Sequence, residues 1–158
     1  MKAATIKQLK TELKNRSEGD LIEICLTLAR FKKETKELLT YLLFEADNET
    51  GYIDTVKEEI DEQFLSINTD SFYYIKKSVR KILRNTKKYI RYSKNKETEI
   101  ELLLYFCMKL KDFTPSILKN RVLNNIYQRE MDALKKKITF LHEDLQFDYN
   151  RTLESFVD

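Results

Sequence analysis

The scarcity of turn-forming residues constrains the fold of this chain more than any other feature. Only two glycines and one proline occur in 158 residues. A multi-stranded β protein needs Gly, Pro or Asn-Gly turns about every 8 to 12 residues, which this sequence cannot supply. Its 42% hydrophobic residues are too many for a disordered chain, although 35% are charged. The sequence therefore predicts an all-α fold: a single-domain bundle over residues 1–158.

Hydrophobic periodicity predicts about seven helices in this bundle. Ile6, Leu9 and Leu13 mark a short first helix, and Ser17 is placed to cap a second. A third carries the segment 37–46, which is apolar enough to be mostly buried, and a fourth spans roughly residues 52–67. These four helices occupy the first half of the chain.

The second half of the chain has its own helix signals. Asp70 or Ser71 can cap a fifth helix, and the sixth, over residues 99–110, is apolar nearly all round, which predicts that it lies at the centre of the fold. Thr114 and Pro115 together form a start signal for a seventh helix. That helix either runs long or breaks between His142 and Asn150 into a final short helix.

A weak internal repeat leaves two architectures open. Shifting the chain by 82 residues aligns Cys25 with Cys107 and Phe31 with Phe113, within helices of the same phase. Stacked helical hairpins of the HEAT-like kind would give such a pattern, and so would an irregular bundle.

Two stretches carry a family resemblance. LTLARFKKETKELLTYLLFE, over residues 26–45, and KYIRYSKNKETEIELLLYFCMKLKDF, over residues 88–113, resemble a family of small uncharacterised all-α proteins of bacteria of the Bacteroidetes type. The resemblance implies an all-α fold. It brings no function with it.

The residue inventory argues against catalysis. His142 is the only histidine, which excludes a di-iron bundle with two Glu-x-x-His motifs and a three-histidine zinc site. Two glycines cannot build a phosphate-binding loop, and acidic pairs such as Glu58-Glu59 are typical of a solvated helix face. Cys25 and Cys107 lie in apolar stretches and are predicted to be buried, reduced thiols. We expect no enzyme activity, no cofactor, no metal site and no catalytic residue.

The location of the chain is predicted from features that it lacks. The first residues, MKAATIKQLKTELK, contain no apolar core of a secretory signal. The longest apolar run, residues 102–108, is about a third of the length that crosses a bilayer. We expect a cytoplasmic protein with no membrane partner.

The segment 73–96 carries ten Lys or Arg residues and no Asp or Glu. On a helical wheel its apolar residues, with Phe72, gather in one arc that would face the core: Phe72, Ile75, Val79, Ile82, Leu83, Tyr89 and Ile90. The opposite arc is a candidate binding face of nine cations: Lys76, Lys77, Arg80, Lys81, Arg84, Lys87, Lys88, Arg91 and Lys94. Many of these are like-charge pairs four residues apart, which destabilise an isolated helix, so a partner of opposite charge is expected.

Three partners compete for this basic face. The acidic segment 45–70, with nine acids and one lysine, could neutralise it within the chain. Nucleic acid could bind it through phosphates, with Tyr73, Tyr74 and Tyr92 stacking on bases. An acidic protein could also bind, whereas an anionic membrane would need the apolar face that the core requires.

From these observations we predict a non-catalytic helical protein-interaction or structural module. Its partner would be an unknown protein, or a second copy of the chain in a homodimer. The alternative function is sequence-independent nucleic-acid binding through the basic helix 72–96.

Overall fold

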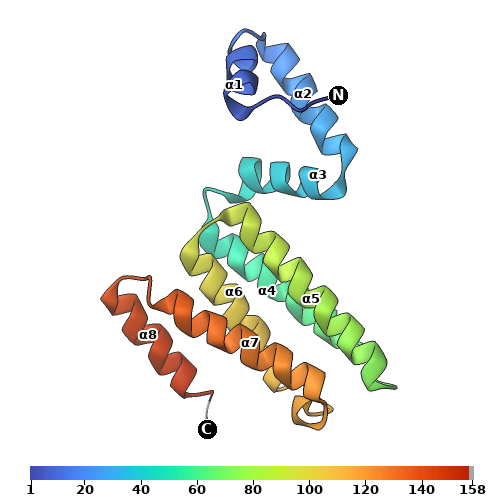
Figure 1. Cartoon of the computed structure of the whole chain (residues 1–158), viewed down its shortest axis with the longest axis vertical. Coiled ribbons are helices and arrows are strands. Elements are labelled where there is room, and N and C mark those ends of the chain that lie inside the picture. The colour runs from blue at the N-terminus through green and yellow to red at the C-terminus, as the bar shows by residue number, and fades with distance from the viewer. Residues whose placement is uncertain (157–158) are drawn as a thin grey trace. The chain divides into compact units, whose positions relative to one another are not determined.

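A computed structural model of the chain describes residues 1–156, and no strand occurs in this range. Eight α-helices and two short helical turns of other types follow one another (Figure 1), which confirms the predicted all-α class. In chain order they are α1 (Ile6–Lys14), α2 (Glu18–Phe31), α3 (Lys33–Thr40), the π-helical η1 (Tyr41–Glu45), α4 (Glu49–Leu65), α5 (Phe72–Ser93), α6 (Lys96–Lys111), the 3₁₀-helical η2 (Ile117–Lys119), α7 (Arg121–Ile138) and α8 (Glu143–Glu154).

The chain divides into two compact units, Met1–Glu45 and a second that begins at Ala46, where the sequence predicts one domain over 1–158. The division follows the distribution of buried apolar side chains. Tyr41 is the only buried residue described in the first unit, and all other buried residues belong to the second. Each unit is therefore described by itself.

The first unit contains α1 to η1. Ser17 caps α2 as predicted, because its Oγ accepts a hydrogen bond from the Asp20 amide at 3.1 Å. The prediction that residues 37–46 are mostly buried is wrong, since Leu42, Leu43 and Phe44 are all exposed. Three consecutive side chains spread around a helical turn, so they cannot all face one neighbouring helix. Cys25 is also exposed, against expectation.

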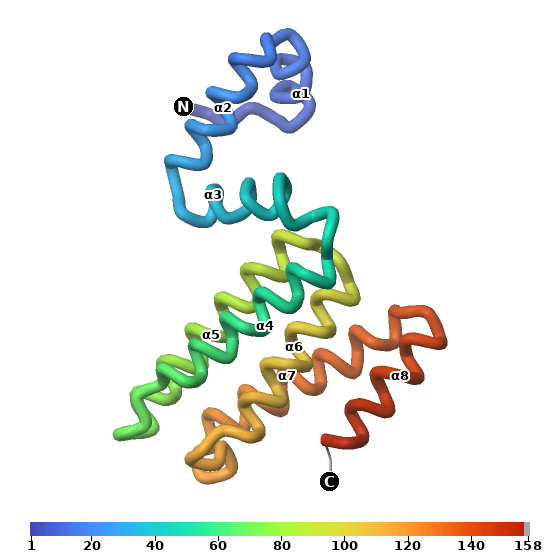
Figure 2. The backbone as a smooth tube through the Cα atoms, turned by 180° about the vertical axis from the view of Figure 1, so that it is seen from behind, coloured from blue at the N-terminus to red at the C-terminus, as the bar shows by residue number. Residues whose placement is uncertain are grey.

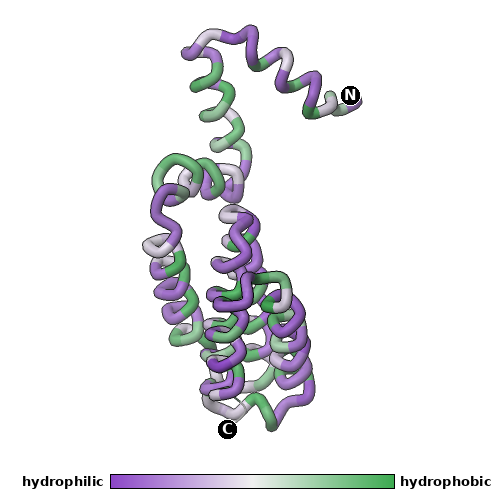
Figure 3. The backbone as a smooth tube through the Cα atoms, turned by 90° about the vertical axis from the view of Figure 1, so that its left-hand side faces the viewer, coloured by the Kyte–Doolittle hydropathy of each residue, from purple (hydrophilic) through white to green (hydrophobic). Residues whose placement is uncertain are grey.

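The second unit is a bundle in which α6 contacts α4, α5 and α7. Helices α4 and α5 lie side by side as an antiparallel hairpin, and the rear view in Figure 2 shows the same pairing. Hydrophobic and hydrophilic residues alternate along these helices in Figure 3, as expected for elements that each bury one face. Helix α6 is buried on several sides, with Ile100, Leu102, Phe106 and Leu110 fully covered. The prediction that this helix is central is confirmed, and Cys107 is buried on it as predicted.

The predicted start of the seventh helix is wrong. The Thr114–Pro115 peptide bond is cis, the short turn η2 follows, and α7 begins only at Arg121. Asn120 caps α7 instead, because its Oδ1 accepts hydrogen bonds from the amides of Val122 and Leu123 at 3.1 and 3.2 Å. One capping side chain thus satisfies two amides that the helix leaves without partners.

Of the two predicted endings, a separate final helix is confirmed, but the predicted place of the break, between His142 and Asn150, is wrong because residues 143–150 lie within α8. Helix α7 stops at Ile138, and His142 then caps the separate helix α8. None of the described helices has the length and apolar character needed to span a membrane. The HEAT-like arrangement stays a prediction.

Candidate anion-binding groove

Helix α5 buries the face that its periodicity predicts. Ile75, Val79, Ile82, Leu83 and Ile90 are all buried, while Phe72 and Tyr89, also predicted for this face, are only partly covered. A threonine and a tyrosine that the sequence analysis missed complete the buried set: Thr86 and Tyr92. The Thr86 hydroxyl donates to the Ile82 carbonyl oxygen at 2.9 Å, which satisfies this buried polar group within the helix.

The nine predicted cations do not all occupy one site. Six of them line two adjoining open grooves: Lys76, Lys77, Arg80, Arg84, Lys87 and Arg91. The other three line neither groove: Lys81, Lys88 and Lys94. Lys94 is the C-cap of α5, with a left-handed φ of 56°, so it lies beyond the helical stripe.

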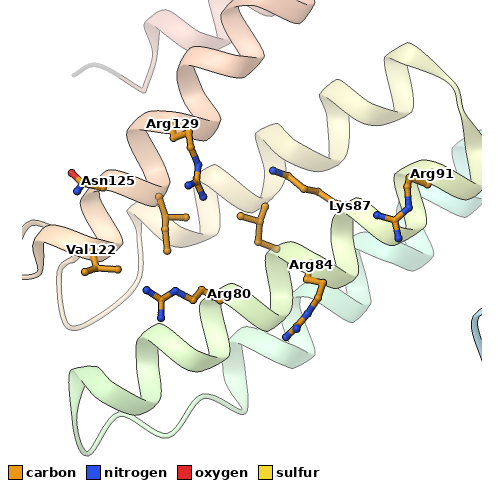
Figure 4. Close-up of a pocket in the computed structure, with 9 residues that line it drawn as sticks. Arg80, Arg84, Lys87, Arg91, Val122, Asn125 and Arg129 are labelled. Carbon is orange, nitrogen blue, oxygen red and sulfur yellow. The ribbon is translucent and has the colours of Figure 1, made fainter.

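The first groove lies between α5 and α7 and has a volume of about 500 Å³; we call it the α5/α7 groove. Figure 4 shows the basic side chains of α5 along one side of it and Arg129 on α7 on the other. Its apolar lining residues are Leu83, Val122 and Ile126. The sequence does not predict Arg129 in this groove, because no pattern in α7 alone indicates which residue faces α5.

Arginine is concentrated in this groove. Four of the eight arginines in the chain line it, compared with one of the 21 lysines. Arginine presents a planar fork of donors that binds phosphate or carboxylate oxygens in pairs and can also stack on flat groups. The groove is thus better suited to oriented oxyanions than to a diffuse negative field.

One buried acid lies beneath the cations. Glu130 is 2% exposed, and its Oε1 accepts a hydrogen bond from Lys87 Nζ at 2.9 Å and lies 3.5 Å from Arg129 Nε. By contrast, Arg80, Arg84 and Arg91 form no ion pair with any residue that the structure describes. The positive charge of Lys87 is therefore compensated by an acid within the fold, whereas the charges of the three arginines of α5 are not.

Two acids of α4, Asp61 and Glu59, bind Lys109 of α6 and Tyr89 of α5 rather than the arginines of α5. The Asp61 carboxylate pairs with Lys109 Nζ of α6 at 2.8 Å and accepts a hydrogen bond from the Tyr105 hydroxyl at 2.7 Å. Glu59 accepts a hydrogen bond from the Tyr89 hydroxyl of α5 at 2.8 Å. Neutralisation of the basic face by residues 45–70, one of the three alternatives, thus forms no ion pair with Arg80, Arg84 or Arg91.

These contacts shift the pKa values of the cluster formed by Asp61, Tyr105 and Lys109. Burial acts to raise the pKa of Asp61, but the hydrogen bonds from Lys109 and Tyr105 and the Lys109 charge outweigh it, so the pKa lies below its ordinary value of 3.8. The same contacts raise the pKa of Lys109, chiefly through the hydrogen bond to Asp61. This cluster stabilises the α4–α6 packing and takes no part in the groove.

A second groove of about 520 Å³ adjoins the first at Arg80 and Arg84, and Tyr73, Lys76 and Lys77 complete its lining; we call it the Tyr73 groove. Tyr73 is 66% exposed, and its ring meets the exposed ring of Tyr74 edge-on, with centroids 5.4 Å apart. Tyr92, the third predicted stacking residue, is buried and cannot reach an external base.

Within residues 1–156, no group of three or more His, Cys, Asp or Glu side chains is arranged to hold a metal ion. His142 is exposed and accepts a hydrogen bond from the Asp144 amide through Nδ1 at 3.4 Å, as the cap of α8. Comparison with known proteins finds no matching family model, curated protein or solved structure. The Bacteroidetes-type resemblance stays a prediction.

Proposed function

We propose that this chain is a non-catalytic binding module that holds an anionic partner in the α5/α7 groove. The observation that carries the proposal is the set of unpaired arginines from α5, which share one groove with Arg129 from α7. Repulsion among like charges destabilises such a cluster, and a bound polyanion relieves it.

The composition of the groove supports binding rather than chemistry. Its lining side chains are Arg, Lys, Asn, Leu, Val and Ile, and none is an acid, a histidine, a hydroxyl or a thiol. General acid–base and nucleophilic catalysis near neutral pH draw mainly on those missing groups. A protein partner or a second copy of the chain, both expected from the sequence, would need to place carboxylates here.

Heparin-affinity chromatography tests this proposal with a generic polyanion. The variant Arg80→Glu with Arg84→Glu reverses two groove cations, and Lys10→Glu with Lys14→Glu on α1 reverses two exposed cations of the same spacing elsewhere. Each pair takes the formal net charge from +3 to −1.

We expect the wild type and the α1 variant to be retained and to elute only as salt screens the contact. The α5 variant should pass through at low salt. Equal loss of retention in both variants would show that net charge alone acts, and the proposed site would be wrong.

A further inference from the structure

We infer that the anionic partner is a single-stranded nucleic acid, an inference that rests on the proposed function. Its phosphates would lie along the arginines of α5, and its bases would contact Tyr73 and the apolar lining of the α5/α7 groove. The inference is carried by the joint presence of a linear row of cations, an exposed aromatic ring and an apolar groove floor.

The cations form a line rather than a cluster. Lys76, Arg80, Arg84 and Arg91 recur on one side of α5, so at 1.5 Å rise per residue the row of cations spans about 22 Å, and Tyr73 lies one turn beyond its first member. Successive lining cations are three or four residues apart along most of it, or about 5 to 6 Å. Such a row matches an extended polyanion with regularly repeated charges.

The Tyr73 groove contains an exposed aromatic ring, which is not needed for binding a phosphate backbone alone. The Tyr73 ring lies at one end of the row, beside Lys76 and Lys77, with its side chain largely exposed. Stacking of a base on an aromatic side chain strengthens binding by about 5- to 150-fold, for any base, because every base has a π-face. Exposed Tyr next to phosphate-binding cations is typical of surfaces that bind single strands.

The residues that line the grooves favour a single-stranded nucleic acid over a duplex, an acidic peptide or an anionic membrane. In a duplex the faces of the bases are stacked inside, so the part-exposed Val122 would face only sugar and phosphate; Leu83 and Ile126 beside it are 7% and 6% exposed. An acidic peptide could pair with the arginines but offers Tyr73 no stacked base. An anionic membrane would meet the cations and the exposed rings of Tyr73 and Tyr74, but the continuous apolar face of α5 that would insert is buried in the bundle.

Fluorescence polarisation with three labelled probes tests the inference on the full chain: a single-stranded oligonucleotide of about 15 nucleotides, a duplex of the same length, and polyglutamate of similar charge. We expect the single strand to bind at least about tenfold more tightly than either competitor. If about three to five phosphates are neutralised, its affinity should fall about 20- to 130-fold between 50 and 200 mM salt.

Tyr73→Ala should weaken single-strand binding about 5- to 10-fold and leave duplex binding unchanged. Phe147→Ala, which removes an exposed aromatic from α8, is the matched control and should have no effect. Arg80→Glu with Arg84→Glu should abolish binding of all three probes.

The outcomes separate the inference from the proposed function. Equal or tighter binding of the duplex or of polyglutamate, or unchanged binding by Tyr73→Ala, would overturn the single-strand inference and leave the anion-binding groove intact. If no probe binds and heparin does not retain the protein, the proposed function fails with it.

Discussion

At the scale of single residues, Lys87 differs from the arginines beside it because it has a buried partner. Replacing Lys87 with Ala would leave the Glu130 carboxylate, 2% exposed, with only Arg129 Nε at 3.5 Å. We expect the free energy of unfolding to fall by about 1–3 kcal/mol. Arg84→Ala removes an exposed cation that has no ion-pair partner, and it should change the free energy of unfolding by less than about 0.5 kcal/mol. Urea denaturation at neutral pH checks both variants, and equal losses would refute the special role of the Lys87–Glu130 pair.

The two cysteines also differ in their surroundings. Burial, together with the nearby Glu130 carboxylate, raises the pKa of the Cys107 thiol to about 12, whereas Cys25 is exposed. Because the thiolate is the reactive form, we expect one thiol per folded chain to react with a disulfide reagent near pH 8, and the second only after unfolding. Cys25→Ser should leave no reactive thiol in the folded protein. Rapid labelling of that variant would show that Cys107 is accessible.

At the scale of elements, the proposed binding surface on α5 should bring no gain in stability. Arg80 and Arg84 are exposed, form no ion pair within the described range, and lie four residues apart. Arg80→Glu places an acid four residues from Lys76, and Arg84→Glu places one four residues from Lys88, so each adds an attractive pair worth a few tenths of a kcal/mol. We expect the double variant to be as stable as the wild type or slightly more so. A clear loss in its thermal unfolding midpoint would indicate an internal acidic partner for α5.

The contact between α4 and α6 predicts a dependence on pH. Since the folded-state pKa of Asp61 is below its ordinary value of 3.8, the unfolded chain binds a proton more readily. The Asp61 contribution is therefore complete above about pH 4 and is lost as pH falls through the folded-state pKa. Urea midpoints at about pH 6 and about pH 3 should drop less for Asp61→Asn than for the wild type. An equal drop in both proteins would assign the acid sensitivity to other carboxylates.

The elements that could be predicted are those whose signal lies within one helix. The 3.6-residue period identified the buried face of α5, and the continuous apolar character of α6 identified its central place. The predicted start of α7 is wrong, because Pro115 is compatible with a helix start and Asn120 is the stronger cap. Arg129 could not be assigned to the groove, nor Glu130 to Lys87, since only tertiary packing brings α7 beside α5.

At the scale of the whole molecule, the groove and the core that supports it belong to the same unit. Both sides of the α5/α7 groove, and buried residues such as Ile75, Phe106 and Leu123, come from the unit that begins at Ala46. The first unit has Tyr41 as its single buried residue among those described. Because burial of apolar surface is the main favourable term in folding, stability should be concentrated in the second unit.

A fragment that begins at Ala46 should therefore fold cooperatively and bind heparin as the full chain does. We expect its circular dichroism to report helix content with a single unfolding transition, while a fragment of residues 1–45 should be largely unfolded in isolation. Arg80→Glu with Arg84→Glu, introduced into the larger fragment, should abolish heparin retention there too. If the fragment folds but does not bind, residues 1–45 contribute to the binding surface. If it fails to fold, the second unit depends on the first, and the concentration of stability in the second unit is refuted.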